Sequence, residues 1–486
     1  MGKLMKNEVN IFQSWITPAN GGAPYKADFS EFYFGKNSEM LDGRQRLLWG
    51  GDIIGIPNLA EEFRQLTLHD RPSEGTYNSN VSTWRGFYRF YALTPDLPRI
   101  NSVSDVTPVI ALRFKQYLTI KGGSTSIYKR FKAIVDSHFK RTHKRLSSLP
   151  PADRHRDPEP VEPDFVGLQQ LNLRLRGYAR AQSTMRSEGS QLSARGIDPR
   201  GGRGIEGGWD ISANHAHLIF LLTRKIVPDR SRLDDEGATR LYNGKFSRSV
   251  PGPQYLSPCH PPRATQGYVG KLRWRFLTKN DLAIYLWMFL LMSGLNYDST
   301  LDVDISEDRN WFVPSLQDDD HVLIFSVKGK TGKIVYAPSK VKAEFHPFRI
   351  IRLLVGLSEP LRETLRQERK SLADENAASH SFERQRRIEK LDEGIRSPWL
   401  YCSLGQSGEV KWLDHRDAQA MNIIIRRVVA DEALDIDHPL LATLTTTHTR
   451  DSMLNFAWRH SKRLSVPALA GGHGDFRSLR YYLARK

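Results

Sequence analysis

The last 40 residues hold the side chains best suited to chemistry. Arg450 begins a helical stretch after a Thr-rich run, His473 lies in a Gly-Gly-His-Gly turn, and Tyr481 and Tyr482 follow on a predicted helix. A phosphodiester attacked in line gathers negative charge on its non-bridging oxygens, which a guanidinium and an imidazole N–H stabilise. A tyrosine hydroxyl can attack the phosphorus and hold the phosphate covalently. The residue types indicate phosphoryl transfer, although such a triplet also occurs among ordinary surface and core residues.

The spacing of these residues resembles the C-terminal signature of the tyrosine recombinase (phage integrase) superfamily, in a divergent form. In that family a His-x-x-Arg box is followed by a helix, a Leu-Gly-His turn and the nucleophilic tyrosine. Here His473 lies 23 positions after Arg450, and Tyr482 lies 9 positions after His473. Both intervals match the usual spacing of the family.

Two upstream segments strengthen the resemblance. Residues 293–301, Ser-Gly-Leu-Asn-Tyr-Asp-Ser-Thr-Leu, are similar to the family's Thr-Gly-Leu-Arg-x-x-Glu-Leu box and follow a predicted buried helix at 281–292. The run Val327, Lys328, Gly329 and Lys330 is similar to the family's β-hairpin segment. The resemblance covers about residues 214–486 with insertions, and more loosely 81–145 as a core-binding domain.

The resemblance implies a role for each matching side chain. Tyr482 would attack the scissile phosphate, with Tyr481 as the fallback nucleophile. Arg450 would clamp the phosphate, and His473 would donate a hydrogen bond to it. Lys330, on the hairpin turn, would protonate the leaving 5′ oxygen. The protein–DNA bond would preserve the phosphodiester energy, so we expect no metal and no nucleotide cofactor.

Two positions depart from the family pattern. Asn296 stands in place of the first active-site arginine, and Thr447 in place of the first histidine of the His-x-x-Arg box. Because an amide carries no charge, Asn296 cannot neutralise the developing dianion as a guanidinium does. Thr447 itself, or His448 beside it, is the substitute hydrogen-bond donor that the sequence offers. Three arginines are candidates for the missing cation: Arg273, Arg275 and Arg309.

The distribution of charge points to a polyanionic partner. The 486 residues carry 71 Lys and Arg against 54 Asp and Glu, a net charge of +17. Residues 81–145 contribute a net +10 and residues 441–486 a net +6. We expect the first stretch to grip double-stranded DNA through an amphipathic helix, although a solvated basic helix face is the alternative. The predicted DNA-binding residues on that helix are Lys129, Arg130, Lys132, Lys140 and Arg141.

The elements that must position these residues are mostly helical. The pattern predicts a mainly α protein with a small antiparallel β-sheet, of the α+β class. Strands are expected at 311–313, 322–327 and 333–337, the last two joined by a turn at 328–332. Helices of the C-terminal half are expected at 347–355, 360–373, 418–431, 451–459 and 476–483.

Composition shifts divide the chain into four regions. Residues 147–163 contain five prolines, which mark a boundary. The predicted regions are an N-terminal region of unclear role (1–76), a helical core-binding-like domain (77–146), a Pro- and Gly-rich linker with a polar helix (147–208), and a recombinase-like catalytic domain (209–486) with an insertion near 228–267.

Several classes of protein are disfavoured. The two cysteines, Cys259 and Cys402, give neither a disulfide framework nor a thiolate metal cluster. The longest apolar stretch is too short to span a bilayer, so we expect a cytoplasmic protein, in the bacterial cytoplasm or nucleoid, without membrane contact.

Three hypotheses follow from the sequence. The first is a site-specific DNA recombinase or integrase, of a mobile element, that works as a multimer on DNA, alone or with partner recombinases. The second is a recombinase-fold DNA-binding protein that cleaves weakly or not at all. The third is a related topoisomerase that relaxes DNA.

Overall fold

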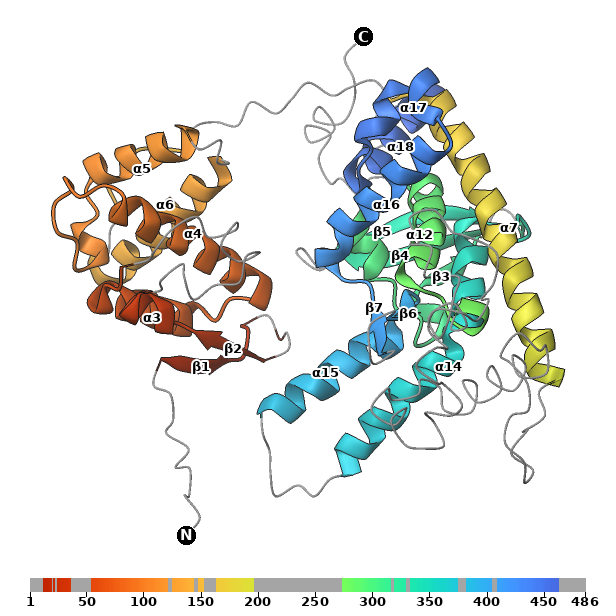
Figure 1. Ribbon diagram of the computed structural model, residues 1–486, viewed down its shortest axis with the longest axis horizontal. Helices are drawn as coiled ribbons and strands as arrows, with labels where there is room; N and C mark the ends of the chain where they lie inside the picture. Colours follow the sequence, from red (N-terminus) through yellow and green to blue (C-terminus); the bar gives the residue numbers. More distant parts are fainter. Residues whose placement is uncertain are drawn as a thin grey trace, which may run out of the picture. The chain divides into compact units, whose positions relative to one another are not determined.

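Helices make up most of the chain in the computed structural model, and the described residues contain three small antiparallel sheets (Figure 1). The expected mainly helical α+β class is therefore confirmed. The chain divides into unit 1, residues Met1–Asp157 with Asn376–Lys390, and unit 2, residues Pro158–Glu375 with Leu391–Lys486. The structure describes residues 12–19, 21, 24–35, 54–120, 125–143, 147–152, 163–195, 273–315, 319–328, 333–374, 382–403 and 409–462.

Unit 1 is a helical body with one short hairpin. Strands β1 (Gln13–Ile16) and β2 (Tyr25–Asp28) pair in antiparallel fashion. Its helices before residue 157 are α1 (Ser30–Phe34), α3 (Pro57–Asp70), α4 (Glu74–Ala92), α5 (Pro108–Ile120) and α6 (Thr125–His143). The Ser73 hydroxyl caps α4 by accepting the N–H of Thr76 at 3.3 Å.

Aromatic side chains from helices α3, α4 and α6 share one core. The rings of Phe63 and Trp84 lie 5.3 Å apart, and those of Phe87 and Phe131 lie 4.7 Å apart. Phe29, which follows β2, is also fully buried in this cluster. Described residues of the predicted N-terminal region (1–76) therefore pack with helices α4 and α6 in a common core.

Unit 2 holds the remaining elements. Its helices are α7 (Phe165–Arg195), α12 (Lys279–Ser293), α13 (Tyr297–Leu301), α14 (Pro347–Asp374), α16 (Ala418–Asp431), α17 (Leu434–Asp437) and α18 (Thr446–Ser461). Helix α15 (Phe382–Arg396) begins in the stretch assigned to unit 1 and ends in unit 2. Its strands are β3 (Phe312–Pro314), β4 (His321–Lys328), β5 (Lys333–Lys340), β6 (Leu400–Cys402) and β7 (Val410–Trp412).

Helix α12 is the centre of unit 2. Every residue from Asp281 to Leu290 is buried, and α7, α14, α16 and α18 all contact this helix (Figure 1). A capping box fixes its start, because the Thr278 hydroxyl accepts the N–H of Asp281 at 3.2 Å. A helix that is apolar on all sides must be covered on all sides, and this one is the scaffold on which the candidate site is built.

The expected β-hairpin is present. Strands β4 and β5 pair from His321 with Lys340 to Lys328 with Lys333, and β3 adds to the outer edge of β4. The inner face carries buried Val322, Ile324 and Val335, which join the core of unit 2. The hairpin was predictable from its two short runs of strand-forming residues and the Gly- and Lys-containing turn at 328–332.

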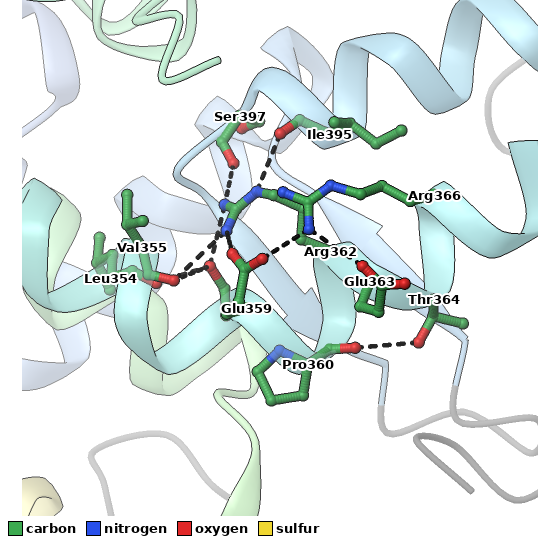
Figure 2. Close-up of polar contacts among 11 residues, drawn as sticks. Leu354, Val355, Glu359, Pro360, Arg362, Glu363, Thr364, Arg366, Ile395 and Ser397 are labelled. Carbon is green, nitrogen blue, oxygen red and sulfur yellow. Dashed lines mark hydrogen bonds and ion pairs between the residues drawn. The ribbon is translucent and has the colours of Figure 1, made fainter. Parts of the chain in front are cut away.

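Helix α14 differs from expectation. Residue Pro360 was expected to begin a second helix, but α14 runs unbroken from Pro347 to Asp374 with Pro360 inside it. Proline removes one backbone N–H donor, which usually breaks a helix. Arg362 Nη1 donates to Val355 O at 3.4 Å (Figure 2), and the Ser358 hydroxyl donates to Leu354 O at 2.6 Å. Neither is the carbonyl that Pro360 leaves without a donor, which is that of Gly356, four residues earlier.

The other helical expectations fall into two groups. The helix at 418–431 has the predicted bounds. The polar helix expected within 147–208 is α7, Phe165–Arg195, and α18 begins at Thr446 instead of 451. The helix predicted at 476–483 and the insertion near 228–267 lie outside the described residues.

Candidate active site

The candidate site begins at the turn that ends α12. Gly294 adopts a left-handed conformation with φ 66°, and its N–H donates to Leu290 O at 3.2 Å. This is the usual way for glycine to end a helix, because a side chain is strained at that φ. The turn sends the chain from the buried core of unit 2 directly into Asn296 and α13.

Gly294 also lets two motif segments meet. A β-carbon placed on Gly294 would lie 2.4 Å from Cγ and 2.8 Å from Cβ of Met453 in α18. No such contact exists between real side chains, so only glycine permits this approach. The segment 293–301 and the helix that carries Arg450 are thus in direct contact, although they are far apart in the sequence.

Asn296 has a structural function at this turn. It is the N-cap of α13, and its Oδ1 accepts the N–H of Ser299 at 2.7 Å. Asparagine is among the best N-cap residues, whereas arginine cannot accept such a bond. The start of α13 therefore uses the amide oxygen of Asn296, and the Nδ2 group is the donor that remains.

Two contacts position the start of α18. The Oδ1 of Asn422 in α16 accepts the N–H of Thr446 at 2.9 Å. His448 Nδ1 accepts the N–H of Thr445 at 3.3 Å, and burial followed by the charge of Arg426 lowers the pKa of His448. A neutral imidazole that accepts through Nδ1 carries its proton on Nε2. His448 therefore serves as a capping residue of its own helix.

Arg450 lies on the face of α18 that is turned inward. Its exposed fraction is only 6%, and Met453 lies one turn further along the same face. Thr447, one turn before Arg450, shares this face and is exposed, with its hydroxyl 2.8 Å from that of Thr445. His448 is two residues from Arg450, which places it on the opposite side of the helix.

A half-buried carboxyl adjoins Arg450. Burial raises the pKa of Asp451 to about 6, despite the opposing effect of the Arg450 guanidinium. The group therefore changes charge close to neutral pH, next to the candidate phosphate clamp.

A buried arginine in α14 holds the segment that follows α15 (Figure 2). Arg362 donates through Nε to Ile395 O and through Nη2 to Ser397 O, both at 2.9 Å, and its exposed fraction is 2%. The segment that it holds continues to Trp399, whose Nε1 donates to Thr300 O in α13 at 2.8 Å. Arg362 thus fixes a chain of contacts that ends at the helix capped by Asn296.

Four of the predicted catalytic residues lie outside the described part of the chain. They are Lys330, His473, Tyr481 and Tyr482. The ends of the hairpin that would carry Lys330 are described, since Lys328 and Lys333 form the last pair of β4 and β5.

The arginines considered as replacement cations differ in their contacts. Arg273 is fully buried and binds Asp281, with Nη2 and Oδ1 3.0 Å apart. Arg309 is 81% exposed and pairs with Glu307 of its own turn. Arg275 is half-buried, and its Nε has no hydrogen-bond partner among the described residues.

The basic face predicted on α6 is mostly exposed. Lys129, Arg130, Lys140 and Arg141 are exposed, and Arg141 Nη1 also donates to Gln65 O at 3.2 Å. Lys132 is half-buried and pairs with Asp136 at 2.9 Å. The exposed four are available to a polyanion, whereas the charge of Lys132 is already balanced.

Sequence patterns did not reveal Asn422, Arg362 or Asp451 as contributors to the site. Asn422 and Arg362 act through partners distant in the sequence, for which no local signal exists. The sequence showed Asp451 only as a carboxylate beside Arg450. The burial that raises its pKa is known only from the fold.

Comparison with known proteins finds weak structural similarity to solved structures. No protein-family model and no curated protein matches the chain. A structure of the XerH site-specific recombinase bound to difH substrate, a pre-cleavage complex, is 12% identical, with a TM-score of 0.38 over 93% of this chain and 88% of that chain. A post-cleavage complex of XerH with palindromic difH substrate is 11% identical, with a TM-score of 0.37 over the same shares. Because both TM-scores are below 0.5, we base no functional conclusion on them.

Two further observations concern the described residues alone. None of their helices is long and apolar enough to cross a membrane. They also contain no group of three or more His, Cys, Asp or Glu side chains arranged to hold a metal ion.

Proposed function

We propose that the protein is a tyrosine-type site-specific DNA recombinase, which cleaves and rejoins strands through a 3′-phosphotyrosine. The observation that carries the proposal is the contact of Gly294 with Met453, because it joins the two motif segments that the sequence resemblance predicts to share a site. The β4–β5 hairpin supplies a third expected element. A role in a mobile element, as an integrase, belongs to the same proposal.

In the proposed reaction, Arg450 binds the non-bridging oxygens of the scissile phosphate. A guanidinium held by a packed helix neutralises developing charge without reorganisation, which is the main source of such catalysis. Tyr482 attacks the phosphorus and releases its hydroxyl proton to water, and the 5′ oxygen leaves with a proton from Lys330. The phosphate stays on the tyrosine as a diester. His473 and Thr447 donate hydrogen bonds to the same oxygens. Attack by the freed 5′ hydroxyl of another strand reverses these steps.

A covalent-trapping experiment tests the proposal. The full chain is incubated with labelled nicked duplexes of random sequence, from which the cleaved fragment diffuses away, and adducts are resolved under denaturing conditions. We expect an adduct with the wild type and with Tyr481→Phe, and none with Tyr482→Phe. Tyr481→Phe is the control, because it changes the neighbouring tyrosine of the same predicted helix and keeps the proposed nucleophile.

The second candidate is a DNA-binding protein that does not cleave. The cap formed by Asn296 favours it, because the position of the first arginine is used to start α13. Selective binding of particular sequences from the random pool, with no trapped adduct on those sequences, would support this candidate and reject the recombinase. Relaxation of supercoiled plasmid without sequence preference would instead indicate a topoisomerase.

A further inference from the structure

Helix α16 holds the start of α18 at two points. The Oδ1 atom of Asn422 accepts the N–H of Thr446 at 2.9 Å, and Arg426 Nε donates to Leu444 O at 3.1 Å. Asn422 and Arg426 are one turn apart on the same face of α16. Two side chains of one helix therefore hold both ends of the short segment that leads into α18.

The backbone of this segment suits the two contacts. Leu444 has φ −56° and ψ 135°, and Thr445 has φ −134° and ψ 162°, so the chain is extended at both residues. In an extended chain the C=O before a residue and the N–H after it point to the same side. Two extended residues span about 7 Å and one helical turn advances about 5.4 Å, so side chains on adjacent turns of α16 reach both groups.

Helix α16 is itself attached to the scaffold helix α12. Trp287 Nε1 in α12 donates to the carbonyl of Met421, the residue before Asn422, at 3.0 Å, and the side chains of Trp287 and Met421 are fully buried. The contact of Gly294 with Met453 fixes α18 further along its length. Helix α18 is therefore held to α12 at two levels, which together set its direction and its rotation.

A change at the start of α18 is transmitted to the candidate phosphate clamp. Thr446 and Arg450 are one turn apart on the same buried face of α18, with exposed fractions of 4% and 6%. A guanidinium lies at least about 6 Å from the helix axis, so a rotation of about 10° moves it by about 1 Å. A displacement of about 1 Å is enough to break a hydrogen bond of about 2.9 Å.

We propose that Asn422 and Arg426 are positioning residues, which set the rotation of α18 and so direct the Arg450 guanidinium at a phosphate of the DNA. Neither side chain needs to touch the DNA itself. Their function rests on the part of the proposed function in which Arg450 binds a backbone phosphate, and it does not require strand cleavage.

A double-mutant cycle on DNA affinity tests this function. Arg450→Gln is made in the wild type, in Asn422→Leu and in Asn422→Asp, and the Kd for a random duplex is measured by fluorescence anisotropy. We expect Arg450→Gln to weaken binding about tenfold in the wild type and less than about twofold in Asn422→Leu, whose guanidinium is misdirected. Asn422→Asp should restore most of the effect, since a carboxylate oxygen also accepts the N–H of Thr446.

Two neighbouring arginines of α16 supply a matched control. Arg426→Met removes the bond to Leu444 O. Arg427→Met removes the same charge from an exposed position that has no hydrogen bond or ion pair with the described residues. The effect of Arg450→Gln should shrink in Arg426→Met and stay at about tenfold in Arg427→Met.

Each effect of Arg450→Gln is a ratio within one background, so a general loss of affinity cancels. Equal ratios in every background would overturn the proposal, because a purely structural function of Asn422 lowers affinity independently of Arg450. A ratio near one in the wild type would overturn it too, since Arg450 would then bind no phosphate.

The covalent-trapping experiment decides cleavage separately. If the wild type traps no adduct on the sequences that it binds selectively, unequal ratios support the positioning residues while the recombinase is rejected. An adduct together with equal ratios supports the recombinase and rejects the positioning residues.

Discussion

Gly294 and Met453 touch so closely that the glycine has no room for a β-carbon, which would lie 2.4 Å from the methionine Cγ. This contact fixes α18 against the end of α12. Everything proposed for Asn296 and Arg450 as parts of one site depends on it.

Replacing Gly294 with alanine tests that relationship. The side chain is strained at φ 66° and collides with Met453, so we expect Gly294→Ala to lower the free energy of unfolding by about 2 kcal/mol. DNA cleavage should fall further than DNA binding, because α18 must shift. Gly177→Ala in α7 is the matched control: nothing lies within 4 Å of its β-carbon, and the change should be neutral or slightly stabilising. Unchanged stability of Gly294→Ala would contradict the geometry.

Variants of Asn296 separate its function as the N-cap of α13 from its proposed contact with the phosphate. Aspartate caps a helix as well as asparagine, so Asn296→Asp should unfold within a few tenths of a kcal/mol of the wild type, whereas Asn296→Ala should lose about 1 kcal/mol. If the Nδ2 group meets the phosphate, the carboxylate repels it, and we expect adduct formation by Asn296→Asp to fall at least about tenfold. Equal adduct yields from Asn296→Asp and the wild type would show that this residue only caps α13.

Arg362 is predicted to be essential for stability. Its removal leaves the carbonyls of Ile395 and Ser397 without their buried donor, so Arg362→Met should lower the free energy of unfolding by about 3–5 kcal/mol. Arg366, one turn further along α14, pairs with Glu359 and Glu363 at a 44% exposed position. Arg366→Met should change stability by less than about 1 kcal/mol. Denaturant unfolding measures the free energy of unfolding of both variants. Similar losses in the two would contradict the claim that the buried hydrogen bonds of Arg362 stabilise unit 2.

Asp451 should give unit 2 a pH-dependent stability. Burial raises its pKa to about 6, above the value in an unfolded chain, so the folded state binds more protons between pH 4 and 6. Stability from this group is therefore present at pH 4 and declines as pH rises through 6, by about 1 kcal/mol after allowance for its partial exposure. Asp451→Asn cannot ionise, so its stability relative to the wild type should increase from pH 4 to 7. If the free energies of unfolding of the wild type and Asp451→Asn change with pH in parallel, the pKa of Asp451 is the same in the folded and unfolded chains.

The sequence predicted what depends on local pattern. The buried helix α12 and the β4–β5 hairpin follow from an apolar run, short strand-type runs and turn residues, and the structure has both. The continuation of α14 through Pro360 was missed because proline usually ends a helix, whereas buried residues on both sides of it, Leu354, Leu361 and Leu365, hold this helix in the core.

The candidate site was predictable only as separate segments. Motif spacing selected Asn296 and Arg450 without giving their contact, which is a tertiary event between Gly294 and Met453. The cap formed by Asn296 was, in hindsight, a local signal, since asparagine before a short helix is a common N-cap.

The basic face of α6 should make DNA binding steeply dependent on salt. Each phosphate contact releases condensed counterions, so log K falls with log salt by about 0.9 per contact. We expect Lys129→Gln, Arg130→Gln and Lys140→Gln together to reduce this slope by up to about 3, measured by fluorescence anisotropy with a random duplex. Lys132→Gln on the same helix is the control, because Lys132 already pairs with Asp136 at 2.9 Å, and the slope should stay within about 0.5 of the wild type. A slope that is unchanged in the triple variant would mean that this face of α6 is solvated and does not grip DNA.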